Sequence, residues 1–302
     1  MLSIQGVLAA AVTPSRPDVY AMDLGSALEV IDFLCDHPIR GIALFGATGE
    51  FPHFTTEDRI RLANMAIKRS RVPVVVNVTH SVFDESERIA EEAAASGAVA
   101  VLLQPPHYFR YGAGEIRECF VDFSEELGKQ IPLLLYNLPA FNNPVPVEVA
   151  VELLAAGIGA GIKDSSGDWS YFSRLLELRS ERAFTLLVGN DILYAKARMA
   201  GADGGISGCA CAVPELLTAL DEAIVGCNDA RVVRLCCRLD EFLKWVDVFP
   251  GPYGIREALV VRGLKMGVRA IPFSPETERR AAEFREWFEA WLPAVRKEIL
   301  DV

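Results

Sequence analysis

The sequence predicts a parallel (β/α)₈ TIM barrel followed by a C-terminal helical extension. Eight short apolar runs are separated by longer segments with the periodicity of amphipathic helices. Each run is nearly continuous in Val, Leu, Ile and Ala, which is typical of strands covered on both faces. A length of 302 residues with 51% apolar residues also suits one large barrel.

The barrel elements follow in order along the chain. Strands are predicted at residues 6–13, 41–46, 73–78, 98–104, 131–137, 159–163, 184–189 and 204–207. Among the intervening helices, we expect one at 55–70, capped by Thr55, and one at 84–96, closed by Gly97. Each β-then-α unit has the size of a barrel repeat.

The repeating pattern ends near Gly226. Beyond it only helical patterns occur, at residues 230–248, 253–266 and 275–300. We therefore predict a barrel over residues 1–226 and a helical extension over 227–302. Because no low-complexity linker separates them, the two parts are expected to pack together as one unit.

Composition argues against several classes of partner. A net charge of −11 with interspersed signs disfavours nucleic acid and anionic membranes, so a small-molecule partner is predicted. Seven scattered cysteines indicate reduced packing residues and a cytoplasmic protein. The apolar start lacks a basic region and runs into Pro14, which favours a buried strand over a signal peptide. The histidine spacing and the lone C-x-C motif predict no metal site.

The carboxyl ends of the strands carry the polar residues at which barrel enzymes place their chemistry. Lys163, in "GIKDSS", is the first candidate. Desolvation at the barrel opening favours a neutral lysine amine, which can attack a ketone to form a Schiff base. Alternatively, Lys163 merely pairs with Asp164 or Glu50.

Two further strand ends carry candidate groups. Tyr136 ends the preceding apolar run and is positioned to move a proton, or else it is a core residue. The "GATGE" turn offers Thr48 and backbone N–H groups to a carboxylate, or else it is only a tight turn. The late "GGISG" end has no basic residue nearby, which disfavours a phosphate loop.

The combination of "GATGE", "YNLP" and "GIKDSSGD" on successive strand ends resembles the N-acetylneuraminate lyase and dihydrodipicolinate synthase family of Schiff-base aldolases. This resemblance covers nearly the whole chain. It implies that Lys163 forms the imine with pyruvate or a related keto acid, so no separate cofactor is needed. It also implies that Tyr136 shuttles the proton, that Thr48 holds the carboxylate, and that Tyr108 of "PPHYF" reaches into a neighbouring subunit. The expected assembly is a homotetramer built as a dimer of dimers.

Departures from the family pattern narrow the expected substrate. Ala47 replaces a second hydroxyl residue. Phe141 stands where the synthases carry an arginine for an aldehyde-side carboxylate. Ile192 stands where sialic acid lyases carry an acid. "GEFPHFT" and "KDSSGD" look closer to the keto-deoxy sugar acid and hydroxy-oxoglutarate aldolases or dehydratases. The predicted substrate-binding residues are Ala47, Thr48, Ser165, Gly189, Asp191, Ile206 and Ser207.

The sequence thus predicts a lyase that reversibly cleaves a 2-keto-3-deoxy sugar acid, or a similar 4-hydroxy-2-oxo acid, to pyruvate and an aldehyde. One alternative is a dehydratase of a keto-deoxy sugar acid acting through the same imine. An alternative of another class is a non-catalytic sensor of keto acids.

Overall fold

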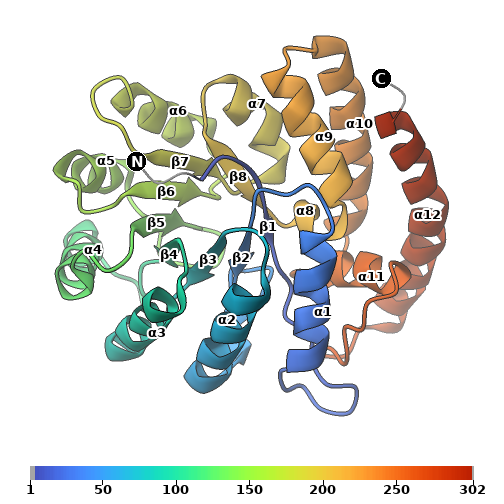
Figure 1. Ribbon diagram of the computed structural model, residues 1–302, viewed down its shortest axis with the longest axis horizontal. Coiled ribbons are helices and arrows are strands. Elements are labelled where there is room, and N and C mark those ends of the chain that lie inside the picture. The colour runs from blue at the N-terminus through green and yellow to red at the C-terminus, as the bar shows by residue number, and fades with distance from the viewer. Residues whose placement is uncertain (1–3, 301–302) are drawn as a thin grey trace.

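The computed structural model describes residues 4–300, so the outermost ends of the predicted segments 1–226 and 227–302 lie outside the described range. Within it, eight parallel strands close into a barrel in chain order, with β1 paired to β8 (Figure 1). The predicted fold is confirmed. The strands are β1 Gly6–Ala10, β2 Gly41–Leu44, β3 Val74–Asn77, β4 Ala100–Leu103, β5 Leu133–Asn137, β6 Gly161–Asp164, β7 Thr185–Val188 and β8 Gly204–Ser207.

Helices follow the strands and surround the barrel (Figure 1). They are α1 Leu24–Cys35, α2 Thr56–Arg69, α3 Phe83–Ser96, α4 Ala113–Leu127, α5 Val147–Ala156, α6 Trp169–Leu178, α7 Tyr194–Met199, α8 Cys209–Ala212 and α9 Pro214–Val225. Short 3₁₀ turns lie at Phe51–His53 and Asp191–Leu193. The extension comprises α10 Asp229–Val246, α11 Tyr253–Val261 and α12 Pro275–Leu300.

The predicted helix signals act as expected. Thr55 is the N-cap of α2, where its Oγ1 accepts a hydrogen bond of 3.2 Å from the Asp58 amide. Gly97 ends α3 with a φ of 96°, a left-handed conformation that favours glycine.

Two details of the prediction were wrong. The helix expected over 253–266 ends at Val261, because Gly263 adopts a φ of 88°. The amides of Gly263 and Leu264 then bond back to the carbonyls of Val260 and Leu259, a closing arrangement that stops a helix. The short helix α8 was not predicted, since its four residues are too few to show a period.

Side chains of each strand alternate between the barrel interior and the surrounding helices. The interior cluster includes Leu102, Leu134, Tyr136, Leu187 and Ile206. A larger cluster fills the layer between the strands and the helices. This alternation decides which strand-end residues can reach the opening of the barrel.

The extension packs against one side of the barrel, where Figure 1 shows α9, α10 and α12 together. Residues 226–228 lie between α9 and α10. All seven cysteines are free. Within residues 4–300, no helix combines the length and apolar character needed to cross a bilayer.

Candidate active site

Lys163 and Tyr136 lie side by side on the inner face of the barrel. They are direct partners in the register between β5 and β6. The Lys163 Nζ atom lies 4.1 Å from the centre of the Tyr136 ring, and the two residues are only 4% and 1% exposed. The amine is therefore desolvated beside a phenol at the carboxyl end of the strands.

Lys163 pairs with neither Asp164 nor Glu50, the two partners that the sequence offered as an alternative. Asp164 points to the other side of β6, where its carboxylate accepts hydrogen bonds from Asn137 Nδ2 at 2.8 Å and Ser166 Oγ at 2.9 Å. Glu50 instead pairs with Arg256. Within residues 4–300, Lys163 makes no ion pair.

Lys163 and Tyr136 line a cavity of about 720 Å³ at this end of the barrel. Most of the sequence-predicted site residues line it as well: Ala47, Thr48, Ser165, Gly189, Asp191 and Ile206. Phe141 and Ile192 also line it and are 70% and 66% exposed, so they lie at its rim. The fold thus gathers these residues from five strand ends, those of β2 and of β5 to β8, around one amine.

Gly189 leaves room for the buried amine. A Cβ atom at this position would lie 2.6 Å from Lys163 Cε and 2.0 Å from Ser165 Oγ, closer than real contacts allow. Gly208 leaves room for the "GATGE" turn in a similar way, because a Cβ atom there would lie 3.2 Å from Thr48 Oγ1. Thr48 therefore lies on the β8 side of the cavity.

Ser207 does not line the cavity, although the sequence placed it in the site. Its neighbours in the chain, Ile206 and Gly208, face inward, so the alternation along β8 directs Ser207 outward. Its Oγ accepts a hydrogen bond of 2.8 Å from the Ala210 amide. The Ser207 side chain also hydrogen-bonds to the Asp191 carboxylate.

Asp191 is one of three acidic residues that line the cavity, together with Glu50 and Asp247. Burial raises the pKa of its carboxyl, while hydrogen bonds from Ser207 and Cys209 and the charge of Lys163 act in the opposite direction. The Cys209 amide donates to Asp191 Oδ2 at 3.2 Å. Asp191 is therefore fixed at the edge of the cavity by the start of α8.

The "GATGE" turn is held by a buried ion pair that the sequence did not reveal. Glu50 has a left-handed φ of 53° and joins Arg256 of α11, with 2.7 Å between Oε2 and Nη1. Tyr20 donates to Glu50 Oε1 at 3.0 Å. Arg256 also donates to the Thr13 and Met266 carbonyls. The extension is thereby fastened to the turn that carries Thr48.

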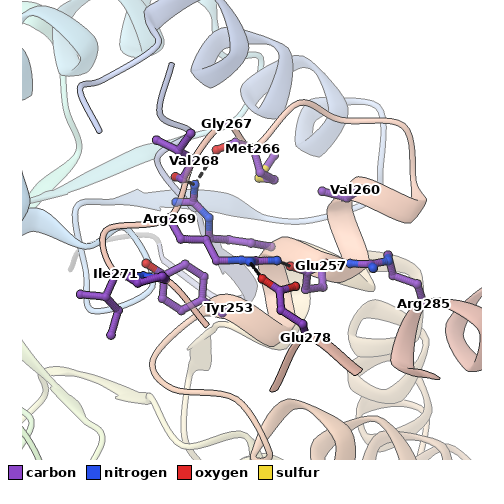
Figure 2. Close-up of a pocket in the computed structure, with 12 residues that line it drawn as sticks. Tyr253, Glu257, Val260, Met266, Gly267, Val268, Arg269, Ile271, Glu278 and Arg285 are labelled. Atoms are coloured by element: carbon purple, nitrogen blue, oxygen red, sulfur yellow. Dashed lines mark hydrogen bonds and ion pairs between the residues drawn. The ribbon is translucent and has the colours of Figure 1, made fainter. Parts of the chain in front are cut away.

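The extension also forms part of the cavity wall. Its contributing residues are Leu243, Val246, Asp247, Pro250, Gly251, Pro252, Tyr253, Ile255, Ala270 and Ile271. A neighbouring pocket of about 610 Å³ shares Tyr253 and Ile271 with the cavity (Figure 2). There Glu257 lies between Arg269 and Arg285, so these charges join α11 to α12.

Tyr108 lies outside the cavity of its own chain. It is 90% exposed and has a left-handed φ of 76°, which is unusual for a residue other than glycine. Its ring packs edge-on against Phe109, whose centre is 5.0 Å away and which is 65% exposed. The pair forms an apolar projection from the β4–α4 loop.

Several polar cavity residues were not predicted. They are Gln104, His107, Asn142, Asn190 and His53. Burial lowers the pKa of His107, and its Nε2 lies 2.8 Å from Ser81 Oγ. Gln104 and His107 belong to the strand end "QPPHYF". The polar character of that strand end could have indicated that they line the cavity. Within residues 4–300, no three His, Cys, Asp or Glu side chains gather to hold a metal ion.

Comparison with known proteins finds relatives over nearly the whole chain. The model of the dihydrodipicolinate synthetase family matches residues 3–290. An uncharacterized DapA-like lyase from Pyrococcus horikoshii is 32% identical over 86% of this chain and 91% of its own length. A 4-hydroxy-tetrahydrodipicolinate synthase from Methanothrix thermoacetophila is 26% identical over 93% of this chain and 95% of its own.

Solved structures share the fold. YagE, a prophage protein from E. coli K12 solved in complex with pyruvate, has a TM-score of 0.87 at 22% identity, over 96% of this chain and 99% of its own. These relatives do not separate the branches of the family. From the family match over nearly its full length, the chain belongs to the dihydrodipicolinate synthetase family and is a lyase of the aldolase type.

Proposed function

We propose that the enzyme cleaves a 4-hydroxy-2-oxo acid to pyruvate and an aldehyde through an imine on Lys163. The observation that carries this proposal is the buried Lys163 amine, 4.1 Å from the Tyr136 ring at the base of the cavity. An amine in such a place can act as a nucleophile, and a neighbouring phenol can move a proton.

The chemistry follows in four steps. Lys163 Nζ attacks C2 of the keto acid, and water leaves to give the imine. Tyr136 accepts the proton of the C4 hydroxyl while the C3–C4 bond breaks. The electron pair of that bond passes into the imine and forms an enamine. The aldehyde departs. Protonation of C3 and hydrolysis of the imine then release pyruvate and the free lysine.

Thr48 and the amides of its turn are proposed to hold the keto-acid carboxylate. The turn lies on the β8 side of the cavity, and Gly208 leaves the approach to Thr48 Oγ1 open. Uncharged donors of this kind stabilise an anion when several N–H groups converge on it.

Within this class, we propose a keto-deoxy sugar acid of five or six carbons as substrate. Phe141 and Ile192 at the cavity rim offer no partner to a second carboxylate or to a distal hydroxyl. This disfavours aspartate semialdehyde and N-acetylneuraminate, respectively. Loss of water from a keto-deoxy acid would use the same imine, and the products distinguish the two reactions, because only cleavage releases pyruvate.

Covalent trapping tests the mechanism. Incubation with pyruvate and borohydride should add one reduced pyruvyl mass at Lys163, located by peptide mass spectrometry. Lys163→Ala should lose the label and all turnover. Lys196→Ala is the matched control, because Lys196 Nζ also lies over an aromatic ring, 3.9 Å from that of Trp169, but outside the cavity. A label elsewhere would refute the assignment, and turnover of any keto acid would exclude a mere sensor.

We also propose a homotetramer built as a dimer of dimers. The exposed Tyr108 and Phe109 rings form an apolar projection that a partner subunit would cover. Light scattering of the purified protein measures the assembly directly, and a monomer would contradict it.

A further inference from the structure

Gln104 stands next to the reacting groups on the inner face of the barrel. It follows β4 directly, and the register Leu103↔Leu135 places Gln104 level with Tyr136, which is level with Lys163. Gln104 is 3% exposed and lines the cavity. The backbone N–H of Gln104 donates a hydrogen bond of 2.8 Å to Thr79 Oγ1, which fixes the backbone at this position.

The orientation of the Gln104 side-chain amide follows from its neighbours. Asn142 Oδ1 accepts a hydrogen bond of 3.0 Å from the Asn143 amide, which fixes the Asn142 side chain. Asn142 Nδ2 then donates to Gln104 Oε1 at 2.8 Å. This leaves Gln104 Nε2 as the free end. Within residues 4–300, Nε2 is buried and has no hydrogen-bond partner.

A buried donor without a partner is costly, so its retention in a cavity indicates a ligand atom. The donor belongs to a wall of the cavity that lies away from Thr48. In the closed barrel β4 is opposite β8, and Thr48 lies against Gly208 on the β8 side. With the carboxylate at Thr48 and C2 at Lys163, the aldehyde half extends toward the wall that carries Gln104.

We propose that Gln104 is a specificity-determining residue that donates Nε2–H to a hydroxyl oxygen on the aldehyde half of the substrate, and that Asn142 is the positioning residue that aims it. This inference rests on the proposed aldolase function. It assigns the aldehyde to the hydroxylated class, because an unsubstituted alkyl aldehyde would leave the donor unpaired.

The test measures the reverse reaction, in which pyruvate condenses with an aldehyde, and compares two aldehydes of equal chain length. Glyceraldehyde carries hydroxyls beyond the carbonyl, and propanal carries none. Gln104→Leu should lower kcat/KM for glyceraldehyde by about 10- to 100-fold, while propanal stays within about threefold. Asn142→Ala should lower the glyceraldehyde value less, because the amide can still rotate into place. Gln130→Leu, at an exposed loop position, should change neither.

Borohydride trapping of pyruvate separates the possible failures. Gln104→Leu should label Lys163 as fast as the parent enzyme, since the keto-acid half is unaffected. Equal losses with both aldehydes, or slower trapping, would show that Gln104 serves the fold or the keto-acid half, and would overturn the inference. Undiminished use of glyceraldehyde would overturn it too. Absence of label in the parent enzyme would instead refute the proposed function.

Discussion

Replacing Arg256 by methionine tests how the extension is joined to the barrel. Arg256 and Glu50 have side chains that are 3% and 5% exposed, with 2.7 Å between Nη1 and Oε2. Arg256→Met keeps most of the side-chain length but leaves the Glu50 carboxylate buried without its cation. The Thr13 and Met266 carbonyls lose a donor as well.

The expected cost is large because the remaining charge is buried. Removing one partner of a buried pair typically lowers the free energy of unfolding by about 3–5 kcal/mol. Tyr20 offsets only part of this loss. Burial and the Glu50 charge raise the pKa of Tyr20, so it stays a neutral donor to Oε1. The double variant Arg256→Met/Glu50→Gln removes the stranded charge and should recover at least half of the loss.

Urea unfolding followed by circular dichroism measures these differences. Arg279→Met is the matched control, because its pair with Glu283 is exposed and should contribute less than about 1 kcal/mol. Activity adds a second measurement. Since Thr48 and Glu50 share one turn, Arg256→Met should also raise KM for pyruvate. A loss below about 1 kcal/mol in Arg256→Met would refute the reasoning.

Four further predictions address the site. Gly189→Ala should slow borohydride trapping at Lys163 at least about tenfold, since its Cβ would overlap Lys163 Cε and Ser165 Oγ; an unchanged rate would contradict the packing. Burial raises the pKa of Asp164, so the folded state binds its proton more tightly than the unfolded state, and stability falls as pH rises from about 4 through the folded pKa. Asp164→Asn should flatten that fall in urea titrations between pH 4 and 7. Mixed Tyr108→Phe and Lys163→Ala subunits should regain activity if Tyr108 completes a partner's site, whereas dead hybrids after proven subunit exchange would exclude this. Steady-state kinetics should give a five- or six-carbon keto-deoxy acid a kcat/KM at least about tenfold above N-acetylneuraminate and aspartate semialdehyde, and the opposite order would mean that Phe141 and Ile192 do not select.

The strands and the central pair could be predicted because their signals are local. A strand buried on both faces needs a continuous apolar run, and Lys163 and Tyr136 break two such runs at their ends. Since all strands of a parallel barrel end at one face, these breaks had to meet there. The cavity contains both residues.

The wall formed by the extension could not be predicted in the same way. Glu50 and Arg256 are 206 positions apart, and nothing local in either segment indicates the other. The early end of α11 depends on backbone hydrogen bonds around Gly263. In the sequence, Gly263 is one of 23 glycines, and nothing marks it as the residue that ends the helix. Tyr108 is likewise exposed in the single chain, so its surroundings within one chain do not indicate what it contacts.

Alternation along the strands explains which of the predicted site residues line the cavity and which do not. Lys163 and Ser165 are two apart and both face inward, as do Ile206 and Gly208, whereas Ser207 between them faces outward. A choice by side-chain polarity alone therefore included Ser207, which does not line the cavity, and left out Gln104, which does. The register supplies the missing condition, because it shows which inward positions of neighbouring strands lie level with Lys163. A polar residue that meets both conditions and retains an unpaired donor is a stronger candidate for substrate recognition than one chosen for its chemistry alone.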